Sequence, residues 1–479
     1  MSKKASLVQR SIASVSWNVV TSFVQVVVGF ARSVLLARWL PVETFGVYRW
    51  AGSIVALTAV LPIFGMGGAF LHRAPETEDE EQTAAVHFTL QLVFTLTWVA
   101  ILSIAALLLT DGQTRITLLV ITVTTGGSQL TQTPRLILAR RVVHRRMAMV
   151  NTLNILLSAL IAIGLAWRGA TLWALLSTDL VTLVINIVAF YIWRPVWRPR
   201  LLWLPNVIRY FLRFGSRNVV AIVLLRALDR VDDLWTGIYL GDTSMGYYSR
   251  AYAFATYPRK LLAVPVNMVA GGTYAELSQD RHKLSQAFFR VNAFLIRSGF
   301  LFAGLLSLVA PEFISIVLGE KWMPMLNTFS LMLVFTLFDP LKTTIGNLYL
   351  AIGRPEQMVK ARLVQLAVLV ISLFLLGSHF GIAGVALAVD VMLVVGIGLL
   401  LWQARAWIDF SAFKLLKIPA VALLCGLALA RLAITFPCVL GSDWYTAIVK
   451  IVIFIPVYSG VLLLFERDNL TALRTLLKR

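Results

Sequence analysis

Charged residues are scarce in this sequence. They make up 14% of its 479 residues, whereas 59% are hydrophobic. A soluble domain usually has about a quarter of its residues charged. Long polar segments are missing as well, since the longest ones lie near residues 71–82, 194–213 and 276–290. None of these is long enough for a soluble enzyme domain, so the composition excludes a water-soluble globular protein and a catalytic domain outside a membrane.

Residues that bind metals or carry catalysis are also rare. The two cysteines, Cys425 and Cys438, are too few for a disulfide framework or a metal site. The five histidines lack the spacing of metal ligands; they are His72, His87, His144, His282 and His379. No glycine-rich loop with an adjacent lysine is present to hold the phosphates of a nucleotide. The sequence therefore predicts no cofactor, no metal site and no catalytic centre.

Long apolar runs recur along the whole chain, for example over residues 148–167, 363–376 and 451–465. A membrane-spanning helix needs about 20 mainly apolar residues. The runs are too long for the strands of a membrane barrel and lack their alternation. The sequence therefore predicts an all-α integral membrane protein with about 14 transmembrane helices.

Basic residues outnumber acidic ones by 43 to 23. Without a soluble basic module this excess does not predict nucleic-acid binding, because basic loops are expected in a membrane protein. Placing both termini in the cytoplasm puts roughly 26 of the 43 basic residues on that side. About 4 then face outward, at Arg38, Arg115, Arg168 and Lys321. We therefore expect a multi-pass protein with both termini cytoplasmic.

A repeat of about 200 residues links the two halves of the chain. Phe45-Gly46-Val47-Tyr48 recurs as Met245-Gly246-Tyr247-Tyr248, and each copy follows a turn. Asp179 and Asp390 lie at equivalent positions later in each copy. Six spans per copy give both copies the same orientation, an arrangement typical of transporters. The repeat predicts an N-lobe of helices 1–6 in residues 1–200, a C-lobe of helices 7–12 in residues 201–405, and helices 13–14 in residues 406–479.

The order and spacing of several short motifs resemble one known family over essentially the whole chain. The motifs are Ser16-Trp17, Arg32, Leu36-Ala37-Arg38, Leu40-Pro41, Phe45 to Tyr48, Phe214-Gly215, Asp232, Leu240-Gly241, Met245 to Tyr248, Ala251, Pro258, Gly319 to Trp322 and Gly353-Arg354-Pro355. Together they resemble the polysaccharide transporter branch of the multidrug/oligosaccharidyl-lipid/polysaccharide exporter superfamily, the Wzx-like oligosaccharide or O-antigen flippases. Trp39 and Val42 depart from the residues common in that family.

The resemblance implies two six-helix lobes in a V around a central cavity, with a C-terminal helix pair. It also implies that a polyprenyl-pyrophosphate-linked oligosaccharide is exported across the cytoplasmic (inner) membrane for synthesis of a surface polysaccharide such as lipopolysaccharide. Membrane lipids and a polysaccharide polymerase machinery are the expected partners. We expect a monomer, because one chain holds both lobes.

Three other functions stay open at this stage. A multidrug/cation antiporter of the same superfamily would need an acidic cavity, whereas the charges within these spans are mainly basic. A flippase for the peptidoglycan lipid precursor would use similar chemistry. A membrane glycan polymerase or ligase usually has a large outer loop with catalytic residues, and the outer loops predicted here are short.

Arginines within the spans are the candidates for binding substrate. Each charge at the centre of a span costs about 2.5–3.5 kcal/mol, so a cavity or an ion pair is expected around it. Arginine also offers two parallel hydrogen bonds to phosphate oxygens. The predicted cationic cavity comprises Arg32, Arg49, Arg217, Arg226, Arg230, Arg250 and Arg297. Arg32 and Arg49 have a second interpretation, in which their side chains extend to the membrane interface.

Carboxylates within the spans are the candidates for ion coupling. They are Asp179, Asp229, Asp232, Asp233 and Asp390. In the seventh span the alternation of arginine and aspartate at a spacing of three residues also fits a self-neutralised ladder. Asp179 and Asp390 also fit a structural role, as a helix cap or in a hydrogen bond between helices.

Overall fold

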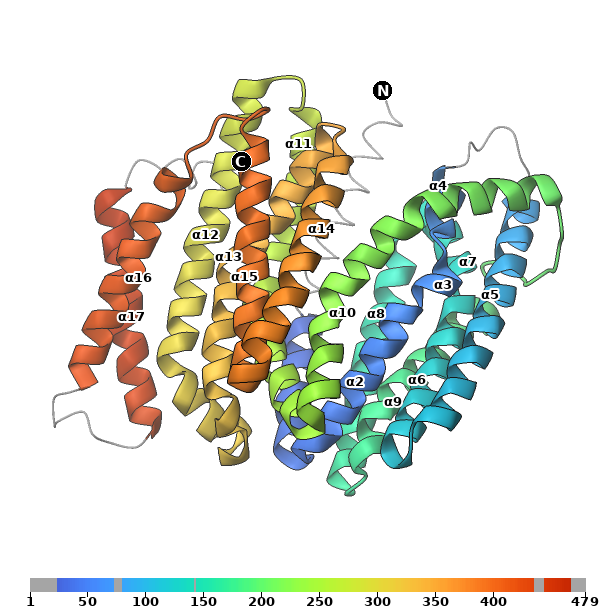
Figure 1. Cartoon of the computed structure of the whole chain (residues 1–479), viewed down its shortest axis with the longest axis horizontal. Helices are drawn as coiled ribbons and strands as arrows, with labels where there is room; N and C mark the ends of the chain where they lie inside the picture. The colour runs from blue at the N-terminus through green and yellow to red at the C-terminus, as the bar shows by residue number, and fades with distance from the viewer. Residues whose placement is uncertain (1–23, 73–79, 142–143, 435–442, 467–479) are drawn as a thin grey trace. The chain divides into compact units, whose positions relative to one another are not determined.

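The computed structural model describes residues 24–72, 80–141, 144–434 and 443–466. Within these ranges every regular segment is a helix and no strand is present (Figure 1). Nine of the described helical stretches are long and apolar enough to cross a membrane. The predicted all-α membrane fold is therefore confirmed, and the chain is a multi-pass membrane protein. Ser16-Trp17 and Cys438 lie outside the described residues.

The chain divides into two compact units, residues 1–246 and 247–479. The first unit begins with a helix over residues 24–39. Its further helices are α2 (Val42–Thr58), α3 (Val60–Ile63), α4 (Met66–His72), α5 (Glu80–Leu109), α6 (Gly112–Leu130), α7 (Gln132–Arg140), α8 (His144–Trp167), α9 (Thr171–Ile187), the π-helical η1 (Val188–Ile192) and most of α10 (Pro205–Ala255).

The second unit continues from the end of α10. Its helices are η2 (Arg259–Ala263), α11 (Val264–Glu276), α12 (Arg281–Glu312), η3 (Phe313–Leu318), η4 (Glu320–Met325), α13 (Leu326–Ala351), α14 (Pro355–Ser372), η5 (Leu373–Gly377), α15 (Ser378–Ala404), α16 (Ala412–Ile434) and α17 (Asp443–Phe465). The two lobes and the helix pair with limits at residues 200 and 405 stay a prediction, as does their V-shaped arrangement.

Helix α5 shows the inverted polarity of a membrane helix. Thr83, His87, Gln91 and Thr95 follow one another at every fourth residue, and each is at most 2% exposed. A spacing of four places them on one helix face. Beyond Gln91, several long aliphatic side chains of the same helix are exposed, with Ile101 at 62%, whereas residues 83–91 are buried on every side of the helix. The polar side chains therefore lie inside the protein, and the second half of the helix leaves apolar side chains for lipid.

Glycines with positive φ separate consecutive spans at two predicted turns. Gly241 has φ 81° within α10, and Gly381 has φ 58° within α15. Residues with a side chain rarely adopt such angles, whereas glycine does so readily. The helices therefore break at the predicted turn, Leu240-Gly241, and at Gly381.

The repeated glycines of the two sequence copies lie at close backbone contacts inside the first unit. A Cβ atom on Gly46 would lie 1.8 Å from the carbonyl oxygen of Asp242. A Cβ atom on Gly246 would lie 2.2 Å from the carbonyl oxygen of Val42. Each copy of the motif thus uses its glycine to approach the backbone of the other copy. This reciprocal contact gives the sequence repeat a physical cause.

Candidate functional site

In the first unit, Asp233 on α10 holds two arginines. Its Oδ2 atom lies 2.8 Å from Nη2 of Arg49 on α2 and 3.3 Å from Nη1 of Arg230. The hydroxyl of Ser53 donates a hydrogen bond to the same oxygen at 2.7 Å. The Asp233 side chain is 1% exposed, whereas those of Arg49 and Arg230 are 28% and 24% exposed. We name Asp233, Arg49 and Arg230 the first cationic cluster.

In the second unit, Asp339 on α13 makes an arrangement of the same kind. Arg259 Nη1 lies 2.7 Å from its Oδ2 atom, and Lys342 Nζ lies 3.2 Å from its Oδ1 atom. Asp339 is 2% exposed, and the two cations are about one-third exposed, at 34% and 32%. Both cations also lie 5.8 Å from the ring centre of Phe335. We name Asp339, Arg259 and Lys342 the second cationic cluster.

The two clusters share one electrostatic design. In each, a buried carboxylate neutralises one of two cations, which leaves a net charge of +1. One cation lies three residues from the aspartate on the same helix, and the other comes from a different helix. The carboxylate fixes the orientation of the cations, whose side chains are 24% to 34% exposed. An anionic group is the ligand that such an arrangement can bind.

Helix geometry contributes to the second cluster, because Arg259 begins the π-helical segment η2. Short π-helical segments within α-helices occur frequently at functional sites. The widened turn lies directly after Pro258, which has no backbone N–H to donate.

Arg32 and Asp179 form a third polar group, in the first unit. Arg32 donates from Nη2 to the hydroxyl of Thr178 at 2.7 Å. Asp179 on α9 accepts a hydrogen bond of 2.8 Å from the hydroxyl of Tyr48 on α2. Asp179 therefore makes the hydrogen bond between helices that a structural role requires, with Tyr48 as the donor. Ion coupling by Asp179 stays a prediction.

Arg297 lies in a buried ion pair that the sequence did not indicate. Its Nε and Nη2 atoms donate to the two carboxylate oxygens of Glu466, each at 2.5 Å, within the second unit. The two side chains are 8% and 3% exposed. A second buried pair on the same helix joins Glu312 of α12 to Lys450 of α17. Because Glu466 neutralises the buried charge of Arg297, no substrate is needed to explain why this arginine is buried. A substrate role for Arg297 stays a prediction.

The remaining predicted residues differ in their surroundings. Arg217 and Asp229 are exposed on α10, and Arg226 and Arg250 are half-buried. Asp232 is buried beside Asp233. Asp390 on α15 is 7% exposed, and its Oδ1 atom has no hydrogen-bonding partner among the described residues. In the part of the chain that the structure describes, no group of three histidine, cysteine, aspartate or glutamate residues could hold a metal ion.

An open groove of about 650 Å³ runs beside α10 in the first unit. Arg209 and Arg213, one helical turn apart, line it together with the apolar side chains of Phe64, Trp203 and Leu212. It places two cations beside an apolar wall, a combination suited to an amphipathic anion.

Sequence reasoning missed six of the charged residues in these groups. They are Arg259, Asp339 and Lys342 of the second cluster, and Glu312, Lys450 and Glu466 of the buried pairs. A signal was available for three of them. Asp339 and Lys342 are opposite charges three residues apart in an apolar run, and Lys450 lies well inside the last span.

A family model described as polysaccharide biosynthesis protein matches residues 35–327. Over 399 residues the chain is 22% identical to the lipopolysaccharide biosynthesis protein WzxC of Escherichia coli K12, covering 80% of this chain and 78% of that protein. Over 394 residues it is 21% identical to an uncharacterized membrane protein in the cps region of Klebsiella pneumoniae, covering 80% and 79%.

Among solved structures, the lipid II flippase MurJ in an inward closed conformation has a TM-score of 0.78 to this chain. The identity is 17%, and the match covers 94% of this chain and 98% of the other. The two proteins therefore share a fold.

Proposed function

Because the chain belongs to the polysaccharide biosynthesis protein family, we propose that it is a flippase for a polyprenyl-pyrophosphate-linked oligosaccharide. It moves this lipid across the cytoplasmic membrane by alternating access, for synthesis of a surface polysaccharide. The observation that carries the proposal is the pair of cationic clusters, in which Asp233 and Asp339 each hold two partly exposed cations.

The clusters bind the pyrophosphate by charge-assisted hydrogen bonds. A guanidinium presents its N–H donors as a planar fork that matches phosphate oxygens, and the side chains of Arg49 and Arg259 are 28% and 34% exposed. The buried carboxylates fix the orientation of these cations before the substrate arrives, which lowers the entropy cost of binding. A net charge of +1 per cluster attracts the pyrophosphate but is small enough to let it dissociate after transport.

The groove lined by Arg209 and Arg213 suits the junction between phosphate and lipid. Its lining combines the two arginines with the apolar side chains of Phe64, Trp203 and Leu212. In this proposal the phosphate contacts the arginines while the first isoprenoid units contact the apolar wall.

WzxC supports this cargo, whereas MurJ supports the peptidoglycan-precursor alternative. WzxC is named for lipopolysaccharide biosynthesis and MurJ for flipping lipid II, so both names refer to bacterial surface glycans. A peptidoglycan-precursor flippase is the second candidate, because that cargo also carries a pyrophosphate and MurJ shares the fold. The clusters oppose a cation antiporter, since their net charge is positive.

Ion coupling, orientation and partners belong to the same proposal. Of the predicted carboxylates, Asp390 suits coupling best, because it is buried and has neither an ion pair nor a hydrogen bond from a side chain among the described residues, which makes its charged form costly. Asp233 is held by three donors and suits a positioning role. We propose a monomeric transporter without catalytic activity, with both termini cytoplasmic, that supplies a polysaccharide polymerase.

The test is flipping of a fluorescent polyprenyl-pyrophosphate oligosaccharide in proteoliposomes. We expect Arg49→Gln and Arg259→Gln each to slow flipping about tenfold or more, because a hydrogen bond to a charged group contributes about 1.5–3 kcal/mol. Arg431→Gln, which removes an exposed cation from α16, is the control and should leave the rate unchanged.

Full flipping by both variants would overturn the role of the clusters. Wild-type vesicles that flip only the peptidoglycan precursor would favour the second candidate. Efflux of drug cations without lipid flipping would establish the antiporter, and formation of polymer from the labelled lipid would establish a polymerase or ligase.

A further inference from the structure

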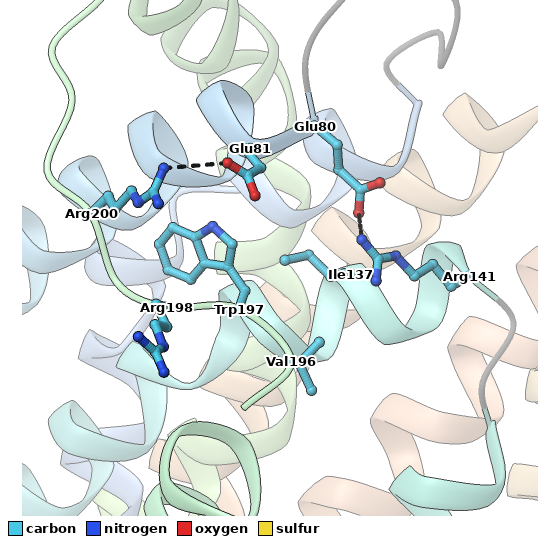
Figure 2. A pocket seen from close by; sticks show the side chains of 8 residues that line it. All are labelled: Glu80, Glu81, Ile137, Arg141, Val196, Trp197, Arg198 and Arg200. Atoms are coloured by element: carbon cyan, nitrogen blue, oxygen red, sulfur yellow. Dashed lines mark hydrogen bonds and ion pairs between the residues drawn. The ribbon is translucent and has the colours of Figure 1, made fainter. Parts of the chain in front are cut away.

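A pocket separate from the cationic clusters lies in the first unit, where several spans end (Figure 2). It has a volume of about 180 Å³. Glu80 and Glu81 come from the first turn of α5, Arg141 directly follows α7, and Trp197 belongs to the connector between η1 and α10. The topology predicted from the basic loops places this pocket on the cytoplasmic side of the membrane.

Two ion pairs lie near the Trp197 ring, one drawn above it and the other to its right (Figure 2). Arg141 lies 3.3 Å from Glu80, and Arg200 lies 3.3 Å from Glu81. These separations are longer than the 2.7–2.9 Å typical of charge-assisted hydrogen bonds. Pairs this exposed contribute only about 0–1 kcal/mol. Both ion pairs are therefore weak enough for a ligand to compete with them.

One further cation lines the pocket without such a pair. Arg198 is exposed, and its side chain has no ion pair or hydrogen bond with any of the described residues. The floor is apolar, with Trp197 at 9% exposed. Three arginines and two glutamates give a net charge of +1, with both signs presented around an indole ring.

We propose that this pocket binds the headgroup of a membrane phospholipid that carries both a phosphate and a primary ammonium group, as phosphatidylethanolamine does. The arginines donate to the phosphate oxygens, Arg198 first because it has no competing carboxylate. Glu81 or Glu80 accepts hydrogen bonds from the ammonium. The apolar floor contacts the glycerol and upper acyl region of the lipid.

The position of the pocket favours a lipid over a soluble phosphate. It lies beside the ends of α5 and α7, where lipid headgroups surround a membrane protein. The presence of carboxylates argues against a purely anionic ligand, because a phosphate without an ammonium would leave Glu80 and Glu81 repelling it. A choline headgroup is disfavoured as well, since its methylated nitrogen has no N–H to donate.

Native mass spectrometry of the detergent-purified full chain tests this, with phosphatidylethanolamine, phosphatidylglycerol and phosphatidylcholine of identical acyl chains as probes. We expect the ethanolamine lipid to bind about tenfold more tightly than the other two, a difference of about 1.4 kcal/mol. The double variant R198Q/R200Q should lose that binding, and Glu81→Gln should remove the preference for ethanolamine over glycerol. Arg168→Gln, an exposed arginine between α8 and α9, should behave like the wild type.

Equal binding of the three lipids, or unchanged binding by R198Q/R200Q, would overturn the proposal. Inorganic pyrophosphate serves as a separate probe for a soluble source. If it binds wild type but not R198Q/R200Q, and no lipid preference is seen, the pocket takes a soluble phosphate and the lipid proposal is wrong. Flipping of the oligosaccharide lipid is not part of this readout, so either result is independent of the proposed function.

Discussion

Arg297 and Glu466 join the middle of α12 to the end of α17 by two parallel hydrogen bonds of 2.5 Å each. Both side chains are almost completely buried, at 8% and 3% exposed. Fifteen residues further along α12, Glu312 pairs with Lys450 in the first half of α17. Along α12 the positive Arg297 precedes the negative Glu312. The positive Lys450 likewise precedes the negative Glu466 along the chain, and because α12 and α17 are antiparallel, opposite charges face each other.

Removing one member of the Arg297–Glu466 pair should destabilise the second unit. We expect Arg297→Met to cost about 3–5 kcal/mol, because the carboxylate of Glu466 stays buried without its cation. The double variant R297M/E466M should recover most of that loss. The thermal unfolding midpoint of the purified protein measures both. Arg290→Gln, an exposed arginine on the same helix, is the control, and a double variant as unstable as R297M would contradict the pairing.

Reversing the charges of the Glu312–Lys450 pair tests whether these two residues interact. Lys450→Glu and Glu312→Lys each place two like charges together in a buried site, and we expect a low yield of folded protein from both. The double variant K450E/E312K restores an opposite-charge pair and should restore the yield. Size-exclusion chromatography in detergent gives the folded fraction, and a double variant no better than the single ones would show that the two residues are not partners.

A methyl group at Gly46 should separate the two copies of the repeat motif. In Gly46→Ala the new Cβ atom would lie 1.8 Å from the carbonyl oxygen of Asp242, so the backbone must shift. Overpacking of this kind costs about 1–3 kcal/mol. Gly52→Ala lies on the same helix with nothing within 4 Å of its Cβ position and should stabilise by up to about 1 kcal/mol through helix propensity. Equal midpoints for the two variants would refute the close contact.

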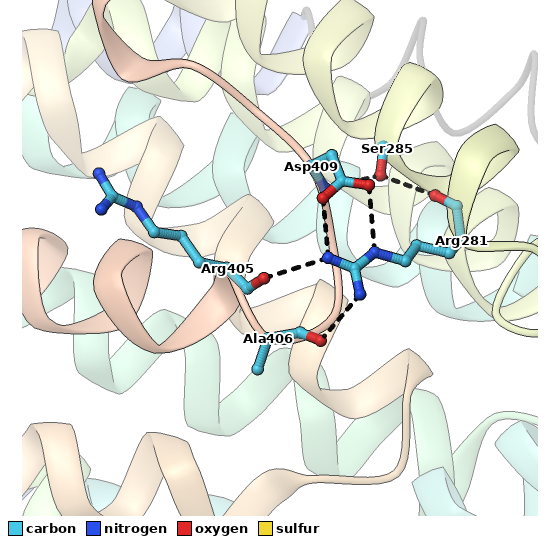
Figure 3. A network of polar contacts seen from close by, with 5 residues as sticks. All are labelled: Arg281, Ser285, Arg405, Ala406 and Asp409. Carbon is cyan, nitrogen blue, oxygen red and sulfur yellow. Dashed lines mark hydrogen bonds and ion pairs between the residues drawn. The ribbon is translucent and has the colours of Figure 1, made fainter.

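The Arg281–Asp409 pair should make the stability of the protein depend on pH under acidic conditions. Arg281 donates to both carboxylate oxygens of Asp409 and to the carbonyl oxygens of Arg405 and Ala406 (Figure 3). The hydrogen bond from Arg281 lowers the pKa of Asp409 below its ordinary value.

A lowered pKa means that the folded state favours the charged carboxylate. The stabilisation is therefore complete above the ordinary aspartate pKa of about 3.9 and is lost as the pH falls below it. We expect Asp409→Asn to lower the thermal midpoint at pH 6 and to match the wild type more closely as the pH falls below 4. A difference that stays constant across this range would show that the pair does not contribute through its charge.

The sequence predicted the membrane class and the turns well because both follow from local properties. A run of about 20 apolar residues commits a segment to the bilayer wherever it lies in the chain. The turn at Gly241 was predictable for a similar reason, since positive φ selects glycine. The repeat at Gly46 and Gly246 was visible because its packing constraint falls on single residues.

The charge pairs were less predictable, since each joins segments far apart in the chain. The sequence offered Arg297 as a candidate because it is a deeply placed charge, but its partner Glu466 lies 169 residues away. Asp233 was identified together with Arg230, three residues earlier, whereas its pairing with Arg49 depends on the packing of α2 against α10. Spacing along one helix is readable from a sequence, and contacts between helices are not.

The separation of these partners has a consequence for how the protein enters the membrane. Arg297 is synthesised 169 residues before Glu466, and Glu312 is synthesised 138 residues before Lys450. At about 5–20 residues per second, α12 exists for roughly ten to thirty seconds before α17 has been made. During that time both charges of α12 lack their partners, so α12 needs the insertion machinery or the headgroup region to hold it. We therefore expect the final placement of α12 in the bilayer to wait until α17 has been made.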